Sequence, residues 1–273
     1  MESPHVDDSP AGGPDSAEFL AAIAHELRTP LSALRVALDL VRDPRTDAVH
    51  PEDDRRLWET IDRSLQRLEQ HITEMLEIGY LRNNTLRLRK ERIDAAGPIA
   101  AALDASRQYA VQRRVTIDLT LEDNLPELRA DPGRLAQVLA TLLTNAIKFS
   151  PLDSSVALEV SSSPSAGGEI ATTAGNGGSN ASPGGPQRLA HVVFSVRDRG
   201  PGIAEQHRKE VFQPFRHTPR RKAEAAVGGL SLAIAHALIA LHGGRLWVES
   251  DGSEGAAFCF SIPVEEDDEG SGG

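Results

Sequence analysis

The sequence predicts a multi-domain protein of the α + α/β class: a helical hairpin that forms a dimeric four-helix bundle, followed by a two-layer α/β sandwich. Two stretches near the start repeat apolar residues mostly at alternating steps of four and three, the spacing of helical bundles. Several later segments alternate apolar and polar residues, which is typical of strands. Amphipathic helices lie between these segments, and helices that cover a mixed sheet form such a sandwich.

The hairpin is predicted over residues 17–82. Its first helix carries the apolar residues Leu20, Ala24, Leu27, Leu31, Leu34, Leu38 and Val41. Its second helix carries Leu57, Ile61, Leu65, Leu68, Ile72 and Met75, with Gly79 as the expected end. Two helices with one narrow apolar stripe each cannot form a core alone, so pairing with a second copy is favoured. A monomeric hairpin that packs on the following domain remains the alternative.

The sandwich is predicted over residues 83–264. Asp131 is expected to cap a helix that has Pro132 in its first turn. A second helix is expected over residues 230–241. The expected strands cover residues 115–119, 156–160, 192–196, 245–249 and 256–262. Residues 161–188 are rich in Gly, Ser and Pro and are expected to form a flexible insert between two strands.

The charge of the chain is concentrated at its ends. The formal net charge is −11 over 273 residues, and ten acids lie in residues 1–18 and 265–273, which contain no Lys or Arg. Without them the chain has 30 acids and 29 bases, so nucleic-acid binding through bulk charge is not expected. Residues 1–16 and 265–273 are predicted to be disordered acidic tails.

Hydropathy and cysteine content limit the class of protein further. No apolar run is long enough to span a bilayer and the acidic start lacks a signal-peptide pattern, so no membrane segment in this chain and a cytoplasmic location are expected. A single cysteine, Cys259, excludes an intramolecular disulfide and is expected to be a packed core thiol.

A histidine in the first helix stands out because of its neighbours. His25 lies two positions from the seam residue Leu27, so it is expected to point into solvent. Pro30 removes a backbone donor and crowds the carbonyl of Glu26, which predicts a bend beyond His25. Thr29 lies one turn away on the same face. Most single helical histidines are ordinary surface residues, but a neutral imidazole beside a carboxylate is also an oriented nucleophile.

Three residues form a polar line on the helix after Asp131. Thr141, Asn145 and Lys148 occur at i, i+4 and i+7. An amide oxygen can ligate Mg²⁺ and an ammonium group can neutralise phosphate oxygens. Such a line can equally be a plain surface edge.

Two further segments suit a nucleotide. Asp198 ends a strand and precedes Gly200 and Gly202, where a carboxylate could accept a hydrogen bond from an exocyclic amine and the backbone could approach a flat base. Phe212 and Phe215 follow, and they can also be ordinary core anchors.

The last helix begins with an anion-binding pattern. Gly228 and Gly229 precede Leu230 at the start of this helix, where backbone N–H groups can bind phosphate. The preceding basic stretch "RHTPRRK" is expected to belong to a lid over the ligand. No Walker A sequence and no dinucleotide-binding G-x-G-x-x-G pattern occurs.

The stretch "HELRTPL" with its flanks resembles the phosphoacceptor box of two-component sensor histidine kinases. The resemblance implies that His25 is phosphorylated, that Glu26 is its acid/base partner, and that Thr29 positions water when a response regulator is dephosphorylated.

The later segments resemble the boxes of the catalytic domain of this family, in the family's order. "RLAQVLATLLTNAIKFS" resembles the N box and implies Asn145 as the Mg²⁺ ligand and Lys148 as a phosphate contact. "DRGPGI" resembles the G1 box, which implies that Asp198 contacts the adenine amino group and that Gly200 and Gly202 line the base. "VFQPFRH", with Phe212 and Phe215, resembles the F box, and the segment that contains Gly228, Gly229 and Leu230 resembles the G2 box.

The resemblance implies a GHKL-type (Bergerat) ATP-binding sandwich, ATP and Mg²⁺ as cofactors, a homodimer, and a response-regulator receiver domain as partner. The expected function is autophosphorylation on His25 and phosphotransfer to a regulator aspartate. Two positions depart from the family pattern: Thr141 replaces an asparagine and Ser231 replaces a third glycine. The alternatives are a weakened kinase that acts as a nucleotide-binding scaffold or response-regulator phosphatase, and another GHKL ATPase.

Overall fold

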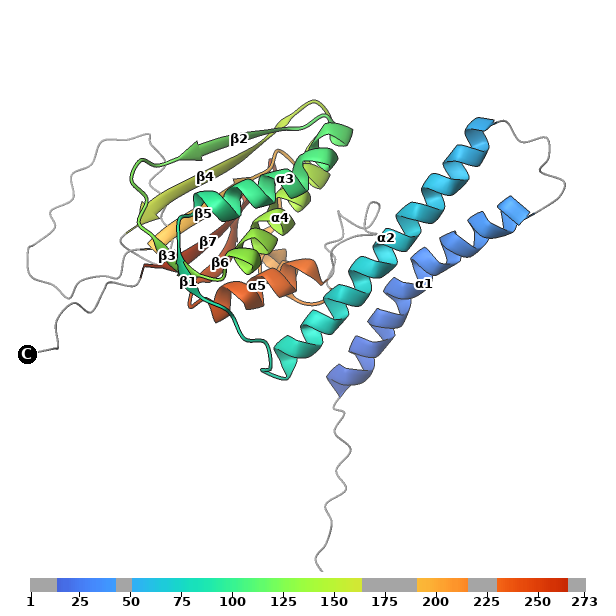
Figure 1. The fold of residues 1–273 in the computed structure, drawn as a ribbon, viewed down its shortest axis with the longest axis horizontal. Helices are drawn as coiled ribbons and strands as arrows, with labels where there is room; N and C mark the ends of the chain where they lie inside the picture. Colours follow the sequence, from blue (N-terminus) through green and yellow to red (C-terminus); the bar gives the residue numbers. More distant parts are fainter. Residues whose placement is uncertain (1–13, 43–50, 164–190, 216–229, 265–273) are drawn as a thin grey trace, which may run out of the picture. The chain divides into compact units, whose positions relative to one another are not determined.

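The computed structural model describes residues 14–42, 51–163, 191–215 and 230–264 (Figure 1). The chain divides into two compact units, residues 1–84 and 85–273, and each unit is described by itself. The predicted acidic segment 265–273, most of the predicted insert, and residues 1–13 lie outside the described residues.

The first unit consists of two long helices. Helix α1 covers Pro14–Arg42 and helix α2 covers Pro51–Arg82, and the two pack side by side (Figure 1). Only part of their apolar surface is covered: Ala37, Ile61 and Ile78 are buried, whereas Leu31 and Leu76 expose more than half of their surface, 57% and 59%. The hairpin by itself therefore has an incomplete core, as its two narrow seams predicted.

The ends of these helices differ from the sequence prediction. Helix α1 begins at Pro14 rather than at residue 17, and it continues through Pro30 as one helix. The predicted end of α2 at Gly79 is wrong, because α2 continues to Arg82. Asn84 takes the left-handed conformation, with φ of 51°, and its N–H donates to the carbonyl of Leu81 at 3.2 Å. Asn is the other residue that commonly ends a helix in this way.

The second unit is a two-layer α/β sandwich, as predicted. The five-stranded sheet has the order β2-β4-β5-β7-β6, in which β2 and β4 are parallel and the other neighbours are antiparallel. These strands are β2 (Thr116–Leu121), β4 (Ser155–Ser163), β5 (His191–Arg197), β6 (Arg245–Glu249) and β7 (Ala257–Pro263). Strands β1 (Glu91–Ile93) and β3 (Leu128–Ala130) form a separate antiparallel pair.

Three helices cover one face of this sheet (Figure 1). They are α3 (Ala96–Arg113), α4 (Pro132–Phe149) and α5 (Ser231–Leu241). Two short 3₁₀ turns, η2 (Glu205–His207) and η3 (Glu210–Phe212), follow β5. The core between the layers includes Phe194 and Phe260, whose rings stack with centroids 4.5 Å apart.

Several features of this unit differ from the prediction, among them strands β1 and β3, which were not predicted. Helix α3 was also not predicted; apart from Ile99, its buried face consists of the small residues Pro98, Ala102, Ser106 and Ala110. Strand β4 extends to Ser163, so residues 161–163 belong to the sheet rather than to the predicted insert. The last partners of the β4–β5 pair are Ser163 and His191, which lie opposite each other.

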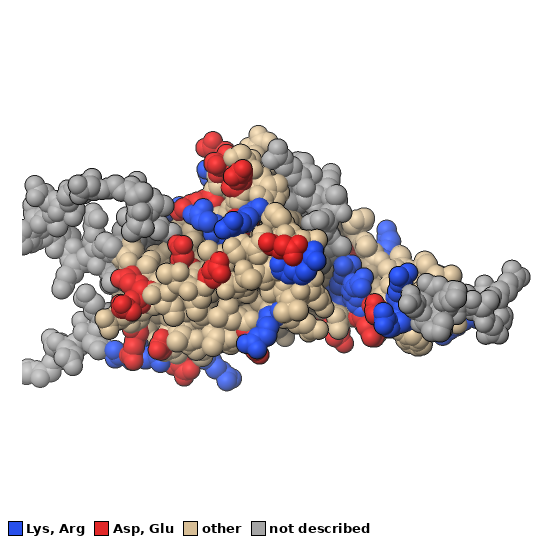
Figure 2. Space-filling model, turned by 90° about the horizontal axis from the view of Figure 1, so that it is seen from above, with Lys and Arg blue, Asp and Glu red and all other residues tan. Residues whose placement is uncertain are grey.

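Cys259 is a packed core thiol, as predicted. Its side chain in β7 is fully buried, and burial raises the pKa of the thiol to about 12. On the face seen in Figure 2, basic and acidic side chains are interspersed among uncharged ones, which agrees with the near balance of charge outside the two ends.

Candidate functional site

His25 lies on the exposed side of α1, as its position relative to the apolar seam predicted. The hydroxyl of Thr29 donates a hydrogen bond to the carbonyl oxygen of His25 at 3.3 Å, so the two residues are one turn apart on the same face. Glu26 is half-buried and Pro30 is buried. The bend predicted at Pro30 stays a prediction.

Glu26 lies in an acidic environment that the sequence did not reveal. Burial raises the pKa of the Glu74 carboxyl on α2, and the negative charges of Glu77 and Glu26 raise that pKa further. The side-chain amide of Gln70 opposes this effect by donating to Glu74 at 3.0 Å. The acid beside His25 is therefore within electrostatic range of carboxyl groups on the neighbouring helix.

The polar line of α4 is largely buried in the second unit. Asn145 and Lys148 are only 8% and 9% exposed, and Thr141 is half-buried. The Lys148 ammonium lies 5.1 Å from the centroid of the Phe149 ring. An amide and an ammonium group on one line of a helix suit a ligand that carries phosphate.

The N-terminal end of α4 is fixed as the sequence predicted. One carboxylate oxygen of Asp131 accepts the N–H of Arg134 at 3.1 Å, and Pro132 occupies the first turn. The other oxygen accepts the N–H of Arg89 at 2.9 Å.

The C-terminal end of α4 depends on a residue that sequence reasoning missed. The guanidinium group of Arg113, at the end of α3, donates to the carbonyl oxygens of Lys148 and Ser150, at 3.1 and 3.4 Å. A cation at this end also interacts favourably with the helix dipole. Because α3 was not predicted, this contact could not be predicted either.

Asp198 is a buried and oriented carboxylate at the end of β5. It is 3% exposed, and its Oδ1 accepts the N–H groups of Gly200 at 2.7 Å and Ala256 at 3.2 Å. Its own N–H donates to the carbonyl of Ala256 at 2.8 Å. These hydrogen bonds orient the carboxylate. Such orientation is required of a group that accepts a hydrogen bond from a ligand amine.

The loop after Asp198 passes close to the end of α4, and this is why it contains glycine. A Cβ atom at Gly200 would lie 2.7 Å from the carbonyl oxygen of Phe149 and 2.9 Å from Asp198 Oδ1. The N–H of Arg199 also donates to the Ser150 hydroxyl at 3.3 Å. These contacts bring the end of β5 against the end of α4, so Asp198 and the polar line belong to one region.

Gly202 packs closely against the turn between β6 and β7. Gly202 has a φ of 68°, and a Cβ atom there would lie 3.1 Å from the hydroxyl of Ser250. That hydroxyl accepts the N–H of Ile203 at 2.9 Å and donates to the carbonyl of Gly255 at 2.7 Å. Sequence reasoning missed Ser250 and Gly255; the glycines at 252 and 255 between two strands were the available signal.

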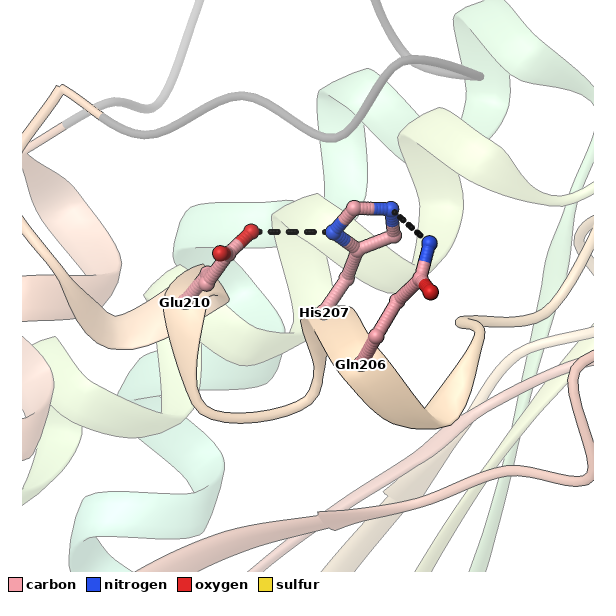
Figure 3. A network of polar contacts seen from close by, with 3 residues as sticks. All are labelled: Gln206, His207 and Glu210. Atoms are coloured by element: carbon pink, nitrogen blue, oxygen red, sulfur yellow. Dashed lines mark hydrogen bonds and ion pairs between the residues drawn. The ribbon is translucent and has the colours of Figure 1, made fainter.

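A polar network organises the segment between Gly202 and Phe212 (Figure 3). Nδ1 of His207 lies 2.9 Å from a carboxylate oxygen of Glu210, and the amide of Gln206 lies 3.2 Å from Nε2. If the amide donates to Nε2, then the ring proton is on Nδ1 and is donated to Glu210. The network therefore fixes the turns that precede Phe212.

The two phenylalanines differ in their surroundings. The ring of Phe212 lies 5.3 Å from the ring of His236 on α5 and 6.2 Å, edge to face, from that of Phe258 on β7. This is the packing of a core anchor, and a contact with adenine stays a prediction. Phe215 is half-buried and has a φ of 59°.

The start of α5 is described only in part. Leu230 is buried, 4% exposed, and precedes the first turn, in which Ser231 is half-buried. Gly228, Gly229 and the basic stretch before them lie outside the described residues.

The donor set is compatible with a magnesium ion that is bound mainly through its substrate. The described residues contain no group of three or more His, Cys, Asp or Glu side chains that could hold a metal by themselves. Mg²⁺ bound with a nucleotide usually takes one or two protein oxygens plus phosphates, and the Asn145 amide can supply one. Among the described helices, none combines the length and hydropathy needed to cross a membrane.

Comparison with known proteins gives two family matches along this chain. Residues 15–84 match the His Kinase A (phospho-acceptor) domain, and residues 130–266 match the histidine kinase-, DNA gyrase B- and HSP90-like ATPase domain. The adaptive-response sensory kinase SasA of Parasynechococcus marenigrum is 30% identical over 90% of this chain. The alginate biosynthesis sensor protein KinB of Pseudomonas aeruginosa is also 30% identical over 90% of it. The chain spans only 56% of the SasA protein and 37% of the KinB protein.

Solved structures show a similar fold. The histidine kinase AdeS of Acinetobacter baumannii superposes with a TM-score of 0.63 at 23% identity, covering 89% of this chain and 98% of AdeS. Full-length ShkA in complex with AMPPNP gives a TM-score of 0.58 at 27% identity, covering 91% of this chain and 46% of ShkA. The histidine kinase ThkA in complex with the response regulator TrrA gives 0.63 at 22%, covering 91% and 61%.

Proposed function

Since this chain belongs to the family of two-component sensor histidine kinases, we propose that it transfers the γ-phosphoryl group of ATP to His25 and then to an aspartate of a response regulator. The observation that supports this most directly is the combination of an exposed His25 in a matched phospho-acceptor domain with a buried, oriented Asp198 in a matched ATPase domain.

In the proposed first step a ring nitrogen of His25 that carries no proton attacks the γ-phosphorus. A phosphorus–nitrogen bond forms, the bond from the γ-phosphorus to the bridging oxygen breaks, and ADP leaves. Glu26 accepts the proton of the other ring nitrogen and so removes the positive charge that develops on the imidazole. In the second step the phosphoryl group passes to the regulator carboxylate.

The residues of the second unit bind and orient the nucleotide in this proposal. Asp198 accepts a hydrogen bond from the adenine amino group, and Gly200 and Gly202 let the backbone lie against the base. Lys148 neutralises phosphate oxygens, and Asn145 supplies an oxygen to the magnesium ion. When bound, the ion neutralises charge on the phosphates. Catalysis of this kind depends mainly on positioning and electrostatics.

The partners follow from the same proposal. A response-regulator receiver domain is the acceptor, and ThkA, a protein of similar fold, has been solved in complex with the response regulator protein TrrA. A homodimer completes the core of the hairpin, for which the exposed Leu31 and Leu76 provide support. We place this part of the chain in the cytoplasm because its substrate is ATP.

The test is incubation of the purified chain with γ-labelled ATP and magnesium. We expect a label that is lost in acid and retained in base, which identifies phosphohistidine. His25→Gln should abolish the label while binding of a fluorescent nucleotide persists. If this variant still acquired an acid-labile label, then His25 would not be the phosphorylated residue.

Asn145→Asp tests the metal assignment separately. The variant puts a negative charge next to the phosphates, so we expect magnesium-dependent labelling to fall by about a hundredfold, as for the loss of one pre-organised polar group in other active sites. Labelling at the normal rate would contradict the assignment.

A weakened kinase that mainly binds nucleotide or dephosphorylates its regulator is the second candidate. Ser231 stands in the first turn of α5, where its side chain adds bulk beside the expected phosphate site, and Thr141 replaces an amide on α4. Nucleotide binding without any label, combined with loss of phosphoryl groups from a labelled regulator, would favour this candidate.

A further inference from the structure

The second unit contains a pocket whose lining does not include Asn145, Lys148 or Asp198. It has a volume of about 470 Å³ and is lined by residues from the 3₁₀ turns, α5 and β6. Its lining includes the cations Arg208, Lys209 and Arg245 and the rings of Phe212, His236 and Trp247. Three cations around aromatic rings suit a ligand with several negative charges.

The position of this pocket follows from strand β6. In the described sheet β6 pairs only with β7, so it is an edge strand. The pocket is lined by four consecutive residues of β6, from Arg245 to Val248. Successive side chains point to opposite faces of a strand, so a pocket that includes all four runs along the open edge. Such an edge can accept an extended peptide.

The cations of the pocket have no acidic partner among the residues that the structure describes. Arg208 donates to the carbonyl of Ser250, and Arg245 lies 5.8 Å from the Trp247 ring, but no ion pair involves either of them or Lys209 in the described ranges. The Nε atom of Arg208 is buried and, within the same ranges, has no hydrogen-bond acceptor.

The nearest acids in the sequence are already engaged. Glu210 is bonded to His207 at 2.9 Å, in the network of Figure 3. Glu249 accepts the indole N–H of Trp247 at 2.9 Å. The charge of the pocket must therefore be balanced by solvent ions or by another segment.

An acidic segment begins close to this edge. Ser261 of β7 is the register partner of Arg245, and β7 ends at Pro263. After Val264 the sequence contains five consecutive acids, Glu265, Glu266, Asp267, Asp268 and Glu269. Neighbouring strands are about 4.8 Å apart. Five extended residues span about 17 Å, so a segment that turns around the start of β6 can reach the pocket.

We propose that residues 265–269 bind in this pocket of the same chain, along the edge of β6. Their carboxylates pair with Arg208, Lys209 and Arg245, and the segment covers Trp247. The proposal does not depend on the kinase reaction, and its test uses no ATP.

The first test is zero-length cross-linking of the full chain with a carbodiimide, which joins an amine and a carboxylate that are in contact. We expect an amide between Lys209 and an acid of residues 265–269 within one chain, identified by mass spectrometry. The yield should fall strongly in 1 M salt, where charge interactions are screened beyond about 3 Å.

Matched variants decide the outcome. Arg245→Gln should lower the yield, whereas Arg107→Gln, which removes an exposed cation on α3, should leave it unchanged. Conversion of the five acids to amides should abolish the product, and the same conversion of Glu2, Asp7 and Asp8 should not. A Lys209 product with other acids only, a product between two chains, or no product would overturn the proposal.

A second measurement does not need the amine of Lys209. The chain contains two tryptophans, so Trp58→Phe leaves Trp247 as the only one. We expect acrylamide to quench Trp247 more strongly after the five acids are converted to amides. Equal quenching in both proteins would contradict a segment that covers this ring.

Discussion

At the residue scale, His242 connects two helices of the second unit through both of its ring nitrogens. It is 2% exposed; Nδ1 donates to the carbonyl of Leu238 at 2.7 Å, and Nε2 accepts the N–H of Asp131 at 3.1 Å. Burial lowers the pKa of His242, and the charge of Lys90 adds to this, while the Leu238 carbonyl and Asp131 act in the opposite direction. The neutral ring therefore helps to hold the N-terminal end of α4 in place.

We predict that His242 makes the second unit less stable in weak acid. Its pKa in the folded state lies below the ordinary value of about 6.5, so the unfolded chain binds the proton first as the pH falls. Stability is complete above about pH 6.5 and is lost as the pH falls from there towards the folded pKa. Urea unfolding at a series of pH values measures this.

The variant His242→Leu provides the control. It should flatten the pH dependence between about pH 7.5 and 5.5 and should cost about 1–3 kcal/mol at pH 7.5, because the Asp131 N–H is left without an acceptor. The same pH slope in this variant and in the parent would assign the effect to another group.

Whether a contact could be predicted depended on how many residues separate its two partners in the sequence. Asp131 binds the N–H of Arg134 three residues later, and the Asp–Pro pair revealed this cap in the sequence. His242 binds Asp131 across 111 residues, and Ala256 binds Asp198 across 58. No local pattern contains such contacts. The oriented carboxylate of Asp198 was expected, whereas the groups that orient it appeared only in the structure.

At the element scale, the junction of α4 with the loop after β5 determines where Asp198 lies. We predict that Gly200→Ala destabilises the second unit by about 1–3 kcal/mol, because the new methyl group meets the carbonyl of Phe149 and neither backbone can move freely. Nucleotide affinity should fall with it, since Asp198 Oδ1 is displaced. Thermal unfolding and nucleotide titration measure the two effects.

Gly133→Ala is the matched substitution. It lies in α4 itself, and its new methyl group would approach no atom closer than Asp131 Oδ1, at 3.6 Å. Alanine is favoured over glycine within a helix, so we expect a gain of up to about 1 kcal/mol. If both substitutions had the same effect, the close approach at Gly200 would not explain its presence.

Helices α3 and α2 differ from the prediction for two separate physical reasons. Helix α3 buries mainly small side chains, such as Ala102, Ser106 and Ala110, so its sequence lacks the strong apolar periodicity that revealed α1, α2 and α4. Gly79 was predicted to end α2 because glycine is common just after the last residue of a helix; within a helix, glycine costs stability. Packing of residues such as Ile78 outweighs that cost, and Asn84 provides the turn.

At the scale of the whole molecule, the exposed apolar residues of the hairpin predict dimerisation. Ile72 on α2 is 50% exposed, and Leu31, Leu65 and Leu76 are exposed as well. We predict that the parent chain sediments as a dimer and that Ile72→Glu raises the dissociation constant at least about a hundredfold, since a charge buried without a partner costs several kcal/mol.

Val111→Glu is the control for the effect of an added negative charge on sedimentation. Val111 is an exposed apolar residue too, 71% exposed, but it lies on α3 of the second unit. Its substitution should leave sedimentation unchanged. A monomeric parent chain, or equal effects of both substitutions, would contradict a dimer formed through the hairpin and would favour the monomeric alternative.

The strand pair β4–β5 has a practical consequence for protein engineering. Its terminal partners, Ser163 and His191, are held opposite each other by the sheet itself. The ladder therefore does not depend on how many residues join these two ends, and the free energy of closing a loop changes only slowly with its length. A short type I′ turn in place of residues 164–190 should leave the sheet folded and provide a shorter chain for crystallisation. A fluorescent domain inserted there should also leave the sheet folded and make the protein visible by microscopy.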